Sequence, residues 1–188
     1  MAVPLVQEVV AKEQLRNFKL MKLQSGFLLL FFFQFGLVSA QESLDKLLAK
    51  YNSQSIPYIS VEELKMQNEN EKVFILDARE IEEFNVSHLK NSIFVGYNNF
   101  SAEKVTSKIL DKNAPIVVYC SLGIRSETIS EKLKNAGYTN VKNLYGGIFE
   151  WKNKSYAVYD SSNIETEEVH AYSKQWSKYL KQGEKVYK

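Results

Sequence analysis

Residues 116–126 read Ile-Val-Val-Tyr-Cys-Ser-Leu-Gly-Ile-Arg-Ser, and the fold expected of the chain follows from this stretch. The apolar run 116–119 predicts a buried strand, and the residues from 126 to 135 predict a helix. The only cysteine of the chain, Cys120, therefore lies where a strand passes into a helix. Open α/β sheets bind their ligands at such carboxyl ends of strands.

The loop between this strand and this helix favours an anion and an activated thiol. Its backbone N–H groups and the N-terminus of the helix carry partial positive charge, and Arg125 adds a full one. Such surroundings lower the pKa of a cysteine and make its thiolate a nucleophile. An inert, buried cysteine is the alternative, but the composition of the loop argues against it. We therefore predict that Cys120 is reactive.

Short apolar runs on both sides of the cysteine loop alternate with helical patterns. The predicted strands are residues 57–59, 73–76, 92–95, 116–119 and 140–144. The predicted helices are residues 41–50, about two turns after Ser60, and residues 80–84, 101–110, 128–135 and 148–151. Strands that alternate with helices indicate an α/β fold with a mainly parallel sheet and helices on both faces.

The N-terminal residues have the pattern of an export signal. Lys22 is followed by an apolar core from Phe27 to Val38 and by small residues up to Ala40. The run is shorter than the roughly 18 residues of a membrane span, although an uncleaved anchor remains the alternative. We predict initiation at Met21 and cleavage near Ala40, with residues 1–40 as an extension plus signal peptide. The mature protein would then be periplasmic or secreted.

The formal net charge of +2 comes from these first 40 residues. They contain four basic and two acidic side chains, whereas residues 41–188 contain 20 of each. The mature chain therefore has no basic field that would attract nucleic acid, and we expect no nucleic-acid partner. A lone cysteine cannot form an intramolecular disulfide, so packing alone must hold the core.

Three motifs together resemble the rhodanese family. The first runs from Asp77 to Arg79 and on through Glu83-Phe84 to the segment Ser-His-Leu-Lys-Asn-Ser at residues 87–92. The second is the cysteine loop, residues 119–126, and the third is Asn-Leu-Tyr-Gly-Gly-Ile-Phe-Glu-Trp at residues 143–151. The resemblance implies a three-layer α/β/α domain, here over residues 41–154, with a mainly parallel five-stranded sheet.

The resemblance also implies sulfur transfer. A cysteine thiolate takes a sulfur atom from a donor, holds it as a persulfide and passes it to an acceptor nucleophile. Cys120 and Arg125 match the catalytic positions. The residues expected to bind the persulfide or the donor are Ser121, Leu122, Gly123, Ile124, Ser126 and Arg79. The implied partners are a small donor, such as thiosulfate or a persulfide, and a thiol or cyanide as acceptor.

Four further residues of these motifs have expected structural roles near the site. They are Asp77, His88, Gly146 and Gly147. Asp77 would tie the loops through an ion pair with Arg79, and His88 would be a hydrogen-bonding core residue rather than a base. The two glycines lack the spacing of a dinucleotide fingerprint and predict a tight turn instead. We expect no cofactor, and the two histidines of the chain lie too far apart in sequence to predict a metal site.

The length and composition of the cysteine loop narrow the chemistry. Protein phosphatases of the same superfamily place five residues between cysteine and arginine and usually have a histidine at the position of Tyr119, whereas four residues separate Cys120 from Arg125 here. This favours sulfur over phosphate. Many sulfurtransferases carry a basic residue at the position of Ser121, and Ile124 is apolar. A single fixed cation weakens the case for thiosulfate, a dianion, as the physiological donor.

Residues 155–188 lie outside the three motifs. Apolar residues at helical spacing within 166–182 predict a helical tail that packs on the domain, and a helix that docks a protein partner is the alternative. We therefore predict an exported, single-domain rhodanese-like sulfurtransferase that carries sulfur on Cys120. A non-catalytic sulfur carrier or a thiol-redox binding module is the alternative function, and turnover with small donors distinguishes the two.

Overall fold

The computed structural model describes residues 44–70 and 73–187. The chain divides into two compact units, residues 1–46 and residues 47–188. Of the first unit only residues 44–46 are described, and they are helical. The predicted signal segment therefore lies outside the described residues. Within the described residues, no helix has both the length and the apolar character of a membrane span.

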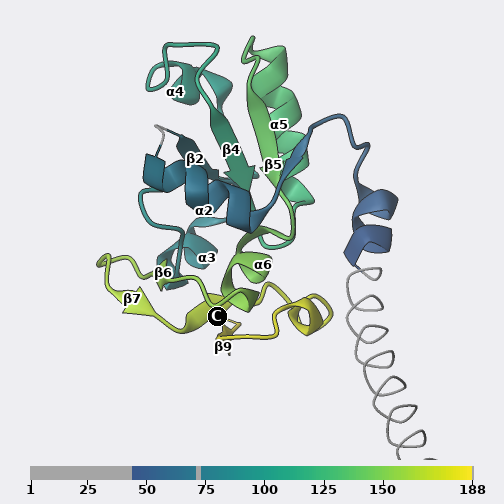
Figure 1. The fold of residues 1–188 in the computed structure, drawn as a ribbon, viewed down its shortest axis with the longest axis vertical. Helices are drawn as coiled ribbons and strands as arrows, with labels where there is room; N and C mark the ends of the chain where they lie inside the picture. Colours follow the sequence, from purple (N-terminus) through teal and green to yellow (C-terminus); the bar gives the residue numbers. More distant parts are fainter. Residues whose placement is uncertain (1–43, 71–72, 188) are drawn as a thin grey trace, which may run out of the picture. The chain divides into compact units, whose positions relative to one another are not determined.

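Five parallel strands form the centre of the second unit, in the order β1-β5-β4-β2-β3 (Figure 1). Their bounds are β1 (Tyr58–Ile59), β2 (Phe74–Asp77), β3 (Ile93–Phe94), β4 (Ile116–Tyr119) and β5 (Val141–Leu144). All four residues of β4 are buried, as expected of a central strand that is covered on both faces. The predicted α/β fold with a parallel five-stranded sheet is thus confirmed.

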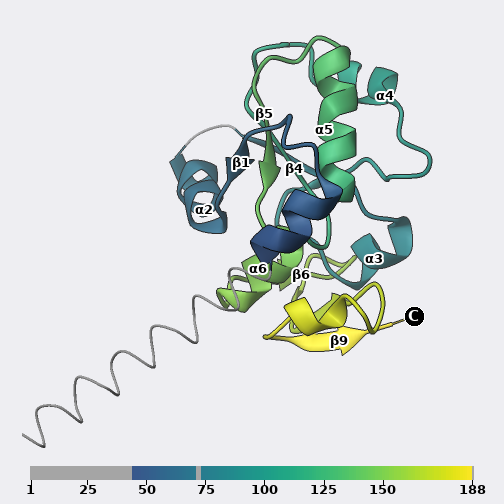
Figure 2. The same ribbon diagram turned by 90° about the vertical axis from the view of Figure 1, so that its right-hand side faces the viewer.

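Helices cover both faces of this sheet. They are α2 (Val61–Asn70), α3 (Ile81–Val86), α4 (Ala102–Thr106), α5 (Arg125–Asn135) and α6 (Gly147–Asn153). Helices α4 and α5 lie on one face, whereas α2 lies on the other and packs against α6 (Figure 2). The core beneath α4 and α5 is built from aliphatic side chains of both helices and of the sheet, including Leu76, Val118, Val105, Ile129 and Leu133.

Two local signals in the sequence correspond to observed helix ends. The hydroxyl of Ser60 accepts a hydrogen bond from the Glu63 N–H at 3.0 Å and caps α2. The hydroxyl of Ser101 caps α4 in the same way. Helix α4 is shorter than predicted, however. It ends at Thr106, and the Ser107 hydroxyl donates to the Lys104 carbonyl as the chain turns away.

The register of the sheet brings two loops to one edge. Asp77 at the end of β2 pairs with Tyr119 at the end of β4. The segment after β2 and the cysteine loop after β4 therefore begin side by side at the carboxyl edge of the sheet, where open α/β folds place their sites.

The C-terminal segment folds as short strands, and the prediction of a helix over residues 166–182 is wrong. Strand β6 (Val158–Tyr159) pairs with β7 (Glu165–Thr166), β8 (Glu168–His170) pairs with β9 (Glu184–Val186), and a single 3-10 turn spans Ser177–Tyr179. Tyr172 has a φ of 62°, which a right-handed helix excludes. The apolar side chains that predicted a helix, such as Val169 and Leu180, are buried from a strand and from the end of this turn.

Candidate active site

Cys120 lies at the first position after β4, and its thiol faces the start of α5. The sulfur accepts a hydrogen bond from the Gly123 N–H at 3.1 Å. The hydroxyl of Ser126 lies 3.5 Å from the same sulfur. Only 2% of the Cys120 surface is exposed. The loop thus folds back over its own cysteine and directs donors towards the sulfur.

Two glycines allow this loop to close. Gly123 has a φ of 107°, a conformation that side chains disfavour, and it presents its N–H to the sulfur. Gly147 lies directly beneath the loop, and a Cβ there would collide with the Cys120 carbonyl oxygen. The backbone after Gly147 supports the loop, because the Ile148 N–H donates to that same carbonyl at 2.9 Å. The closing motif therefore acts as a support for the cysteine loop.

A buried amide fixes the other side of the loop. Asn143 on β5 donates from Nδ2 to the Gly123 carbonyl at 2.8 Å. Its Oδ1 accepts from the Ser126 hydroxyl at 2.7 Å. Asn143 thereby sets the position of both groups that contact the Cys120 sulfur. Asn143 belongs to the third motif, but the sequence predicts no role for it. Its amide is fully buried beside the cysteine loop, and this burial, which only the fold shows, indicates its role.

Opposing effects act on the pKa of Cys120. Burial disfavours the thiolate and would raise the pKa. The positive charge of Arg125 and the hydrogen bonds from the backbone N–H groups of Ser126 and Gly123 stabilise the thiolate and outweigh burial, so that the pKa lies below the ordinary value. The predicted activation of this thiol thus has a geometric basis.

Arg125 does not point freely into the site, because it forms a bidentate pair with Glu83 of α3. Its Nη1 and Nη2 lie 2.6 and 2.7 Å from the two carboxylate oxygens. The Ser121 hydroxyl joins both partners, at 3.0 Å from Nη2 and 3.1 Å from Glu83 Oε1. Burial would raise the pKa of Glu83, but the hydrogen bonds and charge of Arg125 hold it below the usual range. Both groups therefore remain charged.

Glu83 is the main functional residue without a predicted role. The sequence places it in the first motif, and the structure shows that it holds the guanidinium beside the cysteine. The signal that predicts it is indirect. A charged arginine close to the interior needs a counter-charge, and the first motif supplies Glu83 in the helix that follows the adjacent strand β2.

Arg79 lies in the buried structure that supports the site and does not line the pocket. Its guanidinium pairs with Asp77 at 2.6 Å, and both side chains have 0% exposure. The same Nη2 donates to the Ser87 carbonyl at 2.6 Å. The structural role expected of Asp77 matches this geometry, but the substrate-binding role expected of Arg79 does not, because a fully buried guanidinium reaches no ligand.

His88 also belongs to this supporting structure. Its ring stacks on Phe84 with centroids 4.1 Å apart, and Nδ1 lies 3.2 Å from the Phe84 carbonyl oxygen. Its backbone bridges to Tyr159 of β6. His88 is not among the residues that surround the cysteine pocket. Within the described residues, no group of histidine, cysteine and acidic side chains could hold a metal ion.

A pocket of about 170 Å³ opens above Cys120. Cys120, Ser121, Leu122, Ile124 and Arg125 form its base. Its walls come from residues distant in sequence, namely Tyr51, Tyr172 and Trp176. Of the loop residues expected to bind substrate, Ser121, Leu122 and Ile124 line the pocket. Gly123 and Ser126 do not line it and instead contact the Cys120 sulfur.

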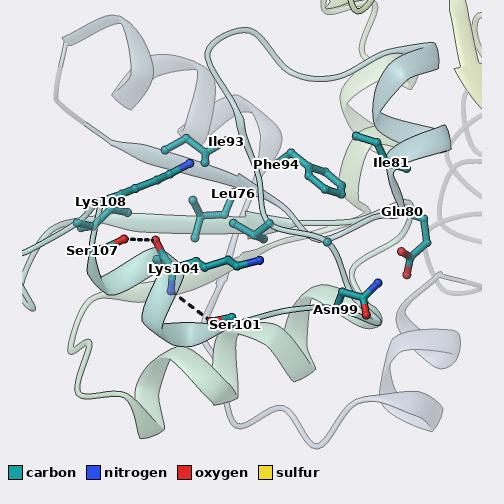
Figure 3. Close-up of a pocket in the computed structure, with 14 residues that line it drawn as sticks. Leu76, Glu80, Ile81, Ile93, Phe94, Asn99, Ser101, Lys104, Ser107 and Lys108 are labelled. Carbon is teal, nitrogen blue, oxygen red and sulfur yellow. Dashed lines mark hydrogen bonds between the residues drawn. The ribbon is translucent and has the colours of Figure 1, made fainter.

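A larger cavity, of about 420 Å³, lies between α3, β3 and α4 (Figure 3). Lys104 and Lys108 line it together with apolar side chains that include Leu76 and Ile93 (Figure 3). The hydroxyls of Ser101 and Ser107 on its rim are bonded to the backbone of Lys104 in α4. This cavity contains no thiol, and we therefore place the candidate active site at the smaller pocket.

The sequence profile of the Rhodanese-like domain family matches residues 60–154. The chain belongs to the rhodanese-like domain family. The match begins at the cap of α2 and ends just after α6, so that it includes all of the cysteine loop, Glu83 and the glycine pair. The strand-to-helix position of the rhodanese loop agrees with the fold described above.

Related proteins differ in what their names say they do. YrkF of Bacillus subtilis, named as a candidate sulfur carrier protein, is 33% identical over 105 residues, which are 55% of this chain and 55% of that protein. The tRNA uridine(34) hydroxylase of Leptospira interrogans is 33% identical over 97 residues, which are 50% of this chain and 26% of that protein. The chain thus spans between about a quarter and about half of these relatives.

Solved structures show the same fold. The thiosulfate sulfurtransferase of Pseudomonas aeruginosa superposes with a TM-score of 0.54 at 20% identity, over 75% of this chain and 26% of that chain. At this identity the likeness concerns the rhodanese fold alone.

Proposed function

We propose that the protein is a rhodanese-like sulfurtransferase that carries sulfane sulfur as a persulfide on Cys120. The observation that carries the proposal is the position of the Cys120 sulfur, which accepts from the Gly123 N–H at 3.1 Å at the base of a pocket beside Arg125. This arrangement favours a thiolate and leaves one side of it facing the pocket.

In the first step, the thiolate attacks the outer sulfur of a donor. A new S–S bond forms on Cys120, the donor's bond to that sulfur breaks, and the electron pair leaves with the rest of the donor. In the second step, an acceptor nucleophile attacks the same sulfur and Cys120 leaves as a thiolate. The loop amides and Arg125 stabilise the negative charge on the sulfur in both steps. No second thiol of the protein is needed, because the sulfur passes directly from Cys120 to the acceptor.

Sulfur on the purified protein tests this proposal directly. We expect the protein incubated with thiosulfate or inorganic polysulfide to gain the mass of one sulfur atom and to release thiocyanate when cyanide is added. The chain has a single cysteine, so Cys120→Ala removes the only thiol and serves as the control. If wild type yields no more thiocyanate than Cys120→Ala with either donor, the proposal is wrong.

A sulfur carrier without turnover is the second candidate. It is favoured by the candidate sulfur carrier YrkF among the relatives and by the pairing of Arg125 with Glu83, which leaves little free charge for an anionic donor. A carrier loads one sulfur per chain but releases no further thiocyanate with excess donor. Repeated turnover would instead identify an enzyme.

We further propose that the domain acts outside the cytoplasm, on the basis of the predicted signal at residues 21–40. N-terminal sequencing of the protein recovered from the periplasm or the medium of a producing cell tests this. A mature end near Gln41 supports export, whereas recovery of only the unprocessed chain inside the cell contradicts it.

A further inference from the structure

Three aromatic side chains stand over the cysteine loop, and none belongs to the part of the chain that the family profile matches. They are Tyr51, Tyr172 and Trp176, here called the aromatic wall. Tyr51 and Trp176 meet edge to face with ring centroids 5.9 Å apart. Tyr172 lies against the guanidinium of Arg125, 4.8 Å from ring centroid to Cζ. The wall is therefore an addition to the rhodanese core that lines the same pocket as Cys120.

The C-terminal segment that carries two of these rings is fixed to the domain. Asn153 at the end of α6 donates to the Tyr179 carbonyl at 2.9 Å and accepts from the Lys181 N–H at 2.6 Å. Lys152, nearly buried, pairs with Glu167 at 2.8 Å. Strand β8 packs against α3. These contacts hold Tyr172 and Trp176 in one place, as a binding surface requires.

Tyr172 adopts a conformation that its residue type disfavours. Its φ of 62° lies in the left-handed region, where a bulky side chain is a true outlier. Half of its surface, 51%, is exposed, so burial does not explain why a large ring stands there. Strained residues of this kind gather at ligand sites. The strain places the ring over Arg125, on the rim of the pocket.

The charges in the pocket do not favour a dianion. Among the side chains that line it, Arg125 is the only basic one, and both of its Nη atoms are bonded to Glu83. Besides Cys120 and the Ser121 hydroxyl, which is bonded to the Arg125–Glu83 pair, the remaining lining is aromatic and aliphatic and includes Leu122 and Ile124. A compact anion such as thiosulfate would approach the negative charges of the Cys120 thiolate and the Glu83 carboxylate. The only nearby cation, Arg125, is already paired with Glu83, so the net charge does not attract such an anion.

Resting on the proposed function, we propose that the aromatic wall selects an organic persulfide with an uncharged apolar group as the sulfur donor. The apolar group lies against Tyr51, Tyr172 and Trp176, and the outer sulfur points down to Cys120. The Cys120 thiolate attacks that sulfur, a Cys120 S–S bond forms, the donor S–S bond breaks, and the electron pair leaves on the organic thiolate. The proton of the persulfide remains with the transferred sulfur or passes to the departing thiolate. No oxidant or reductant is consumed.

The test compares two donors, benzyl hydropersulfide and thiosulfate, with cyanide as the acceptor. We expect kcat/KM for the benzyl donor to exceed that for thiosulfate by at least about tenfold in the wild type. Trp176→Ala should lower kcat/KM for the benzyl donor by about tenfold and change that for thiosulfate by less than about twofold. Tyr172→Gly should have a similar effect, and it also relieves the left-handed backbone, so its unfolding temperature should not fall.

Tyr187→Ala is the matched control, because Tyr187 lies in the same C-terminal segment, is 48% exposed and does not line the pocket. It should leave both donors unchanged. If the wild type uses thiosulfate as well as the benzyl donor, or if both wall variants keep the wild-type ratio, this inference alone is overturned. If Cys120 takes up sulfur from neither donor nor from polysulfide, the proposed function fails and the inference fails with it.

Discussion

Two arginine–carboxylate pairs lie near the carboxyl edge of the sheet, and they differ in burial. Arg79 and Asp77 pair at 2.6 Å with 0% exposure on both sides. Arg125 and Glu83 pair at the same 2.6 Å, but 15% of the arginine side chain and 4% of the glutamate side chain remain exposed. The first pair joins two residues that are two positions apart at the end of β2, whereas the second joins α3 to the start of α5.

The difference in burial separates a charged pair that only stabilises the fold around the site from a pair that borders the pocket. A fully buried pair cannot separate without leaving an uncompensated charge in the interior, so its role is to stabilise the fold. A pair at the edge of a pocket keeps a guanidinium beside the Cys120 sulfur and a carboxylate close enough to tune its charge. The same two residue types thus perform different tasks, because only one pair reaches solvent.

The largest effect is expected from breaking the buried pair. Asp77→Asn leaves the Arg79 guanidinium buried without a counter-charge, which should lower the free energy of unfolding by about 3–5 kcal/mol. Urea denaturation followed by circular dichroism measures this. A loss below about 1 kcal/mol would show that Arg79 finds another partner and that the fold around the site does not depend on this pair.

The pair at the pocket should have a smaller effect on stability and a larger one on donor choice. Glu83→Gln removes charged hydrogen bonds to Arg125 and should cost about 1.5–3 kcal/mol in the same denaturation. It also frees the guanidinium, so KM for thiosulfate should fall relative to the wild type. An unchanged KM would mean that the Glu83 charge does not limit the binding of an anionic donor.

The stability that Glu83 contributes also depends on pH. Its pKa in the folded protein lies below the usual value because Arg125 outweighs burial. The contribution is therefore present above the unfolded pKa of about 4.3 and is lost as the pH falls through the folded pKa. The stability difference between wild type and Glu83→Gln should be constant from about pH 7 to 5 and narrow at lower pH. A difference that widens on acidification would contradict this pairing.

The next prediction concerns the rate at which Cys120 is alkylated. The wild-type rate of alkylation by iodoacetamide should show an inflection below the free-thiol value of about 8.5. Arg125→Gln removes the charge that favours the thiolate, so the inflection should move up and the rate at pH 7 should fall about tenfold. Lys142→Gln, which changes a lysine on β5 that pairs with Glu63 and does not line the pocket, is the control and should not move the inflection.

The smallest effect is expected from a pair at the surface. Lys142 and Glu63 lie 3.2 Å apart with 32% and 43% exposure. Glu63→Gln should change the free energy of unfolding by less than about 1 kcal/mol, because solvent screens such pairs. If this change equalled that of Glu83→Gln, burial would not be the property that separates the pairs.

The sheet and the cysteine loop could be predicted because their signals are local. Short apolar runs bounded by turns identify strands, and Cys120 and Arg125 stand five positions apart in one loop. The C-terminal segment shows the limit of such signals. Apolar residues around Val169 and Leu180 fit helical spacing, but parallel pairing of β8 with β9 and the left-handed Tyr172 override it.

By itself, the sequence determined the order of strands and helices in the rhodanese core, the family and the loop that holds the single cysteine, because each depends on residues close together in the chain. Tertiary structure alone decided what surrounds that cysteine. Glu83 pairs with Arg125 across 42 positions, and the aromatic wall comes from both sides of the rhodanese core. Neither could be predicted, because the charge and shape of a pocket depend on which distant side chains the fold brings to it.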